Sequence, residues 1–171
     1  MIIGFFWTFV VSCFLLYGEL LFAKGQLIFP AGMFVCFYLG VTRSTTTGMT
    51  AGILTACCSE MILGRSFTNL PLFAFMVILL KLFRSFGDRL SIFNQVVIGG
   101  ILSASNAGYY VFFENVHFRH GWSLLSGPRA VTIFLSSIVT GLVTFPIMIL
   151  LLDKISEYVR VEPFTIRARG L

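Results

Sequence analysis

One acidic residue, Glu60, lies within an apolar stretch long enough to cross a bilayer. It belongs to a series of residues, mostly small, at four-residue spacing, which a helix places on one ridge: Gly48, Gly52, Ala56, Glu60 and Gly64. A ridge without bulk lets a neighbouring helix approach closely, as in GxxxG contacts of membrane helices. A carboxylate costs about 3 kcal/mol at the bilayer centre, so Glu60 needs a reason to be there.

Three interpretations of Glu60 stay open. It can be an interfacial acid that reaches the headgroups or pairs with Lys24 or Arg65, a bundle-facing group used in packing or partner binding, or a ligand for an ion or substrate. Glu19 is expected near the same level of the membrane. Two acids there could bind a cation, but we favour a pairing of each with a nearby basic residue, and we interpret Glu60 as the outer end of an assembly face.

A second series of small residues, Gly100, Ala104 and Gly108, predicts another close helix contact. Asn106 lies beside it and can form a hydrogen bond across a helix interface for about 1 kcal/mol or less. We therefore expect Asn106 to fasten two helices together rather than to bind a substrate.

Three potential zinc ligands follow at three-residue spacing, Glu114, His117 and His120, with Trp122 just after them. No fourth ligand is evident, and a polar rim at headgroup level explains them more simply. The sequence contains no HExxH, GxSxG or GxxxxGK[ST] motif. We therefore expect no enzyme activity, no metal and no cofactor.

Composition places the chain in a membrane. Of its 171 residues, 57% are hydrophobic and 11% are charged, against about 25% charged in soluble domains. The net charge of +5 is dispersed over loops rather than gathered on one polar face, which argues against nucleic-acid binding. The four cysteines fall within apolar stretches and show no disulfide or metal spacing.

The predicted fold is all-α, a compact bundle of six transmembrane helices that forms a single integral membrane domain over residues 1–171. The predicted spans are residues 2–23, 27–41, 46–63, 69–83, 92–113 and 130–152. The second and fourth are short for the roughly 20 residues that a spanning helix needs. Residues 153–171 are expected to form a cytoplasmic tail whose first part lies against the membrane surface and whose helix ends at Pro163.

The distribution of basic residues predicts the orientation. If both termini are cytoplasmic, eight Lys and Arg residues lie inside: Arg43, Lys81, Arg84, Arg89, Lys154, Arg160, Arg167 and Arg169. Four lie outside: Lys24, Arg65, Arg119 and Arg129. The excess favours both termini in the cytoplasm.

The order of these features resembles the rod shape-determining membrane protein MreD family. The second span opens at Phe29-Pro30 and carries Tyr38 and Arg43, and the glycine-rich third span ends in Glu60 and Gly64. The last span contains Gly141 and Pro146 and is followed by Asp153-Lys154. The resemblance covers roughly residues 29–158 in order and spacing.

The resemblance implies a non-enzymatic scaffold of the machinery that elongates the cell and synthesises peptidoglycan. Such a subunit would bind MreC and link the MreB filament to RodA and its penicillin-binding transpeptidase. Its glycines, Glu60, Asn106 and Pro146 would then be helix-packing or interface positions.

The alternative is the substrate-binding subunit of an energy-coupling-factor vitamin transporter, to which the MreD family is thought to be similar in fold. Such a subunit needs a polar pocket near the outer face. Glu19, Glu60, Asn106 and His117 could supply one.

Overall fold

The computed structural model describes residues 2–24, 27–64, 70–85, 92–117, 128–159, 161 and 163–164, with the backbone alone at 2, 84–85, 113–117 and 128–130. This part of the chain is all-helical and contains no strand. Its six helices are α1 (Ile2–Lys24), α2 (Ala31–Thr42), α3 (Thr45–Leu63), α4 (Leu72–Ser85), α5 (Ile92–His117) and α6 (Pro128–Val159).

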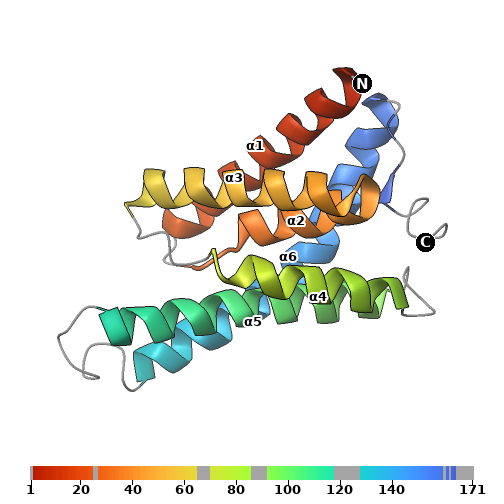
Figure 1. Cartoon of the computed structure of the whole chain (residues 1–171). Coiled ribbons are helices and arrows are strands. Elements are labelled where there is room, and N and C mark those ends of the chain that lie inside the picture. The colour runs from red at the N-terminus through yellow and green to blue at the C-terminus, as the bar shows by residue number, and fades with distance from the viewer. Residues whose placement is uncertain are drawn as a thin grey trace.

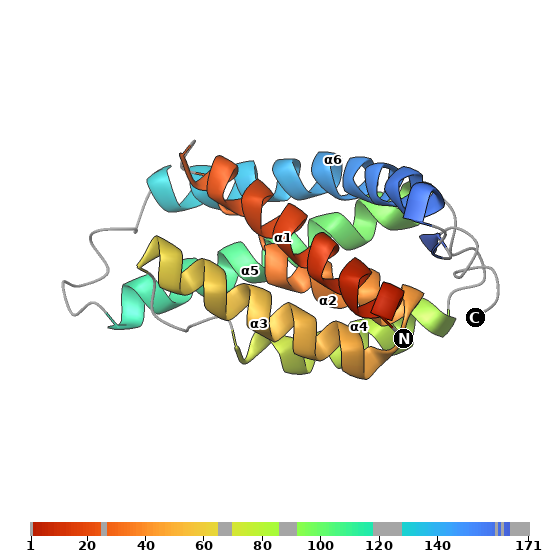
Figure 2. The ribbon, with the colours of Figure 1, turned by 90° about the horizontal axis from the view of Figure 1, so that it is seen from above.

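The helices run back and forth between two ends of one bundle (Figure 1). The start of α1 and the end of α6 lie at the same end, which we call the terminal end (Figure 2). The most extensive pairings are α5 with α6 and α2 with α3. The turn between α2 and α3 also lies at the terminal end, close to the start of α1.

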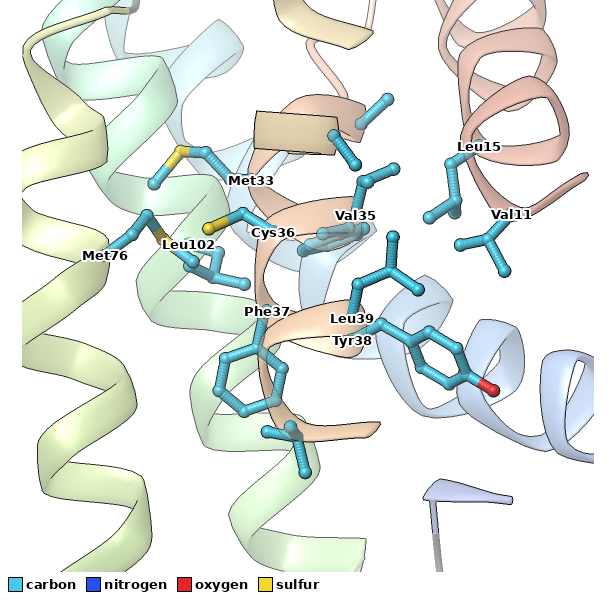
Figure 3. Close-up of a cluster of buried hydrophobic side chains, with 14 of the residues drawn as sticks. Val11, Leu15, Met33, Val35, Cys36, Phe37, Tyr38, Leu39, Met76 and Leu102 are labelled. Atoms are coloured by element: carbon cyan, nitrogen blue, oxygen red, sulfur yellow. The ribbon is translucent and has the colours of Figure 1, made fainter. Parts of the chain in front are cut away.

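The centre of the bundle is α2, whose twelve residues are all buried. Val11 and Leu15 of α1 approach it from one side, and Met76 of α4 from the other (Figure 3). At 1.5 Å per residue, α2 is about 18 Å long. The sequence predicts that this span begins at Leu27, but the helix begins at Ala31, after Pro30. The residue before a proline is disfavoured in helical conformation, whereas proline suits a helix start.

Two glycine-containing ridges bring α2 and α3 together. A methyl group added to Gly48 would lie 2.5 Å from the carbonyl oxygen of Cys36 and 2.5 Å from the amide nitrogen of Gly40. One added to Gly52 would lie 2.7 Å from the carbonyl oxygen of Gly32. Real Cβ atoms essentially never come so close to backbone, so this approach requires glycine on both helices.

Many exposed side chains are apolar and several buried side chains are polar, which is the reverse of the pattern in a soluble domain. Large apolar side chains are exposed on α1, α3, α5 and α6, for example Phe5, Leu54, Phe93 and Leu135, while the interior holds Glu19, Glu60, Gln95, Asn106 and other polar groups. Of the described helices, two are long and apolar enough to cross a membrane, over residues 3–24 and 131–159. Both α2 and α4 are apolar but shorter.

The last helix continues past the predicted end of the span at 152, as expected, and its described part ends at Val159, before Pro163. Of the residues that follow, which are expected to lie against the membrane surface, Tyr158 is exposed. Asp153 and Ser156 are buried, and Phe164 is buried against Phe37 and Tyr38 of α2. These contacts bring the chain after α6 back onto the terminal end of the bundle.

The close approach of α2 and α3 predicts that Gly48→Ala destabilises the protein. The added methyl meets backbone atoms that cannot turn away, and overpacking of this kind costs about 1–3 kcal/mol. Gly108→Ala is the matched control, because its methyl would lie 3.5 Å from the ring of Phe134, an ordinary contact. Unfolding in mixed detergent micelles measures both free energies. Equal stabilities of the two variants would contradict the glycine contact.

Candidate functional site

The polar residues of three helices meet inside the bundle. Glu19 of α1, Ser59 and Glu60 of α3 and Asn106 of α5 are all buried, and Glu60 is only 2% exposed. Glu19, Ser59 and Asn106 line the same small cavity, together with the start of α2. We call these three residues the polar cluster; Glu60 follows Ser59 in the chain but is not among the residues that line the cavity. The sequence predicts that Glu19 and Glu60 lie at one level, and the structure buries both at the end of the bundle opposite the terminal end.

The cavity of the polar cluster is very small. About 10 Å³ is available to the centre of a water molecule, which is roughly the minimum that one water needs. The rest of its lining is formed by Pro30, Ala31, Gly32, Met33, Ala56 and Phe73. The described residues therefore leave no room here for a ligand larger than water.

The interpretation of Glu60 as a side chain that reaches the headgroups is wrong, because Glu60 is buried in the bundle. Of the two basic partners suggested for it, Lys24 is exposed and Arg65 lies outside the described residues. The bundle-facing interpretation fits its burial.

The small-residue ridge on α3 packs against another helix of the same chain. Gly48, Gly52 and Ala56 face α2, so this part of the predicted assembly face is covered by the protein's own helix. Gly64 has another role, because it follows α3 in a left-handed conformation with φ of 64° and its added methyl would meet nothing within 4 Å. Glycine adopts this conformation without strain and ends the helix.

The contact between α5 and α6 is shifted by one residue from the predicted series. Gly99 and Ser103 lie against Gly141, and the methyl groups added to either glycine would meet the other helix's backbone. Gly100 faces Leu142, Gly108 approaches Phe134, and Ala104 is half-buried. The spacing of Gly99, Ser103 and Ala107 is equally visible in the sequence and could have predicted this ridge.

Asn106 lies in the polar cluster, on the same helix as Gly99 and Ser103 but near α1 and α3 through the cavity that it lines. Pro146 lies inside α6 and is half-buried. Its neighbour Phe145 is buried against Phe34 and Phe37 of α2, with ring centroids 4.7 and 5.4 Å apart. This part of α6 thereby contacts the central helix.

A second polar contact lies at the terminal end. The hydroxyl of Tyr38 donates to Oδ1 of Asp153 at 3.4 Å, although the two residues are 115 positions apart. The backbone amide of Phe164 donates to the same oxygen at 2.7 Å. Asp153 thus joins α2, α6 and the segment after α6.

Glu114, His117 and His120, the three potential zinc ligands, lie at or beyond the end of the described part of α5. Within the part of the chain that the structure describes, no three His, Cys, Asp or Glu side chains gather as a metal site. Only the backbone is described at Glu114 and His117, while His120 and Trp122 lie outside the described residues. The four cysteines are free thiols.

Comparison of the chain with protein-family models, with curated proteins and with solved structures finds no match.

The two hydrogen bonds to Asp153 predict that Asp153→Ala releases the segment after α6. The buried amide of Phe164 then loses its acceptor, which costs about 1–3 kcal/mol. Asp153→Asn keeps an acceptor oxygen and should cost less, and Glu157→Ala, on the exposed side of the same helix, should cost nothing. Limited proteolysis beyond residue 159 reports the release. The idea fails if Asp153→Ala and Glu157→Ala are cleaved at the same rate.

Proposed function

We propose that this chain is a six-span protein of the bacterial cytoplasmic membrane that acts as a non-enzymatic scaffold. The observation that carries the scaffold role is the closed polar cluster. Of the two buried acids, Glu19 lines a cavity of water size rather than a pocket for a substrate, and Glu60 is 2% exposed. What remains open to other molecules is the apolar outer surface of the described helices.

The distribution of polar residues supports six spans. On α3 and α5 the polar side chains Thr55, Ser59 and Gln95 are buried, while Met61 and Ile101 are exposed. Helices whose exposed faces are apolar and whose buried faces are polar suit a lipid surrounding. Although α2 is short for the roughly 30 Å hydrocarbon core, it is covered by other helices and needs no lipid contact of its own.

The arrangement of the helix ends supports cytoplasmic termini. Arg43, Lys81 and Lys154 lie at the terminal end, as do the chain positions of Arg84 and the start of α1. Lys24 lies at the opposite end. An excess of Lys and Arg marks the cytoplasmic side.

The resemblance to the MreD family suggests the cellular process in which the protein acts, which is cell elongation. In this proposal the protein binds an MreC-like membrane protein and links it to the MreB filament and to the RodA and penicillin-binding synthase. Because the α2–α3 ridge is covered within the chain, partner helices would pack on outer faces of the bundle. The row of exposed aliphatic residues on α6 at four-residue spacing is such a face: Val131, Leu135, Val139, Val143 and Ile147.

The transporter alternative is less well supported. A vitamin-binding subunit needs a pocket of about 300 Å³ or more, and the polar cluster that would line it encloses about 10 Å³. A small molecule that the purified chain retains stoichiometrically, with a thermal shift on its addition, would favour this alternative.

The topology predicts different labelling of two exposed lysine positions in intact cells. A membrane-impermeant maleimide should label Lys24→Cys from outside and Lys154→Cys only after permeabilisation. The four native cysteines are first replaced by Ser or Ala, and this cysteine-free chain is the control. Labelling of Lys154→Cys in intact cells would contradict the proposed orientation.

The scaffold role predicts that the full chain, isolated from native membranes, co-purifies with an MreC-like protein and a RodA-type synthase. Val139→Trp on the exposed row of α6 should weaken this recovery, whereas Phe93→Trp, on the exposed face of α5, serves as the matched control. Partners are identified by mass spectrometry after crosslinking. Recovery of the chain without either protein, in membranes that contain both, would contradict the role.

A further inference from the structure

An open groove of about 760 Å³ runs between α1 and α3. Residues on one face of each helix line it: Gly4, Phe5, Thr8, Phe9, Ser12, Cys13 and Leu16 of α1, and Thr47, Thr50, Ala51, Leu54, Thr55 and Cys58 of α3. Arg43, just before α3, completes the lining. The polar cluster lies elsewhere in the bundle, so the groove is a separate feature.

The groove is more apolar than its residue types indicate. The hydroxyl of Thr8 donates to the carbonyl of Gly4, that of Thr50 to the carbonyl of Thr46, and that of Thr55 to the carbonyl of Ala51. These hydroxyls are satisfied by their own helices. They leave methyl groups and backbone to face an occupant, which suits a hydrocarbon chain.

Arg43 is the one charged residue among those that line the groove. Within the described residues, its Nε is buried and has no hydrogen-bond partner. Its guanidinium lies against the start of α1, where a methyl added to Gly4 would be 3.2 Å from Nη1. The first turn of α3, capped by Ser44, lies beside it and contributes the positive end of a helix dipole. An anion at this end of the groove would be stabilised.

The dimensions of the groove fit one leaflet. From Gly4 to Leu16 the helix rises about 18 Å, and half of a hydrocarbon core is about 15 Å. Arg43 lies at the terminal end of the bundle, where the groove would meet the headgroups.

We propose that the groove between α1 and α3 binds an anionic phospholipid of the cytoplasmic leaflet, with its phosphate at Arg43 and an acyl chain along the two helices. The inference rests on the proposed membrane topology, but not on the scaffold role. Guanidinium pairs with phosphate through charge-assisted hydrogen bonds, and an anionic headgroup meets the positive end of α3.

The test is native mass spectrometry of the purified full chain, titrated with phosphatidylglycerol or phosphatidylcholine of identical acyl chains. The chain should prefer phosphatidylglycerol, and Arg43→Gln should weaken its binding by about tenfold or more. Lys81→Gln is the matched control, because Lys81 is exposed at the same end of the bundle outside the groove. It should leave the affinity unchanged.

A second variant tests the acyl site without altering charge. Ser12→Phe should fill the groove and reduce binding of phosphatidylglycerol several-fold, whereas Val139→Phe on exposed α6 should not. Equal binding of the two lipids by the wild-type chain, or unchanged binding by both groove variants, would overturn the proposal. So would crosslinking of a partner helix into the groove in native membranes. If maleimide labelling still follows the proposed orientation, these results reject the lipid site alone.

Discussion

The structure depends on one close contact, in which the backbones of α2 and α3 meet through glycine. The twelve residues of α2 are all buried, so this helix has no lipid or water around it and must be held by its neighbours. In a membrane the hydrophobic effect gives little preference between a helix and lipid. Van der Waals contact of closely approaching backbones supplies the attraction instead, and Gly32, Gly48 and Gly52 permit it.

The same constraint explains where the polar residues lie. Because α3 packs on α2, its next turn buries Ser59 and Glu60 in the interior, where Ser59 shares a cavity with Glu19 and Asn106. A second contact through Gly99 and Gly141 joins α5 to α6, and Phe145 of α6 packs on the central helix. The polar cluster is thus enclosed by packing, and its cavity has room for nothing larger than water. The groove between α1 and α3 remains open.

Sequence reasoning predicted the helical elements well because composition and small-residue spacing are local signals. The series from Gly48 to Ala56 predicts a close contact, but its spacing cannot name the helix that it meets. Asp153 and Phe164 show what a local pattern misses, since their contacts with Tyr38 connect distant parts of the chain. The sequence left the burial of Glu60 open among three interpretations, because depth along a helix does not determine which face the neighbouring helices cover. The sequence also placed the α5 ridge one residue away, since Gly99 and Gly100 both have small residues four positions later.

The most direct test of the central claim is a distance between glycine carbons in lipid bilayers. A methyl group added to Gly48 would lie 2.7 Å from the Cα of Gly40, so the two Cα atoms are within roughly 4 Å. Solid-state NMR of the full chain, with glycine labelled at Cα, should show a strong through-space contact between Gly40 and Gly48. If contacts within α2 and contacts within α3 are detected but the contact between Gly40 and Gly48 is absent, this result would contradict the close approach of the two helices.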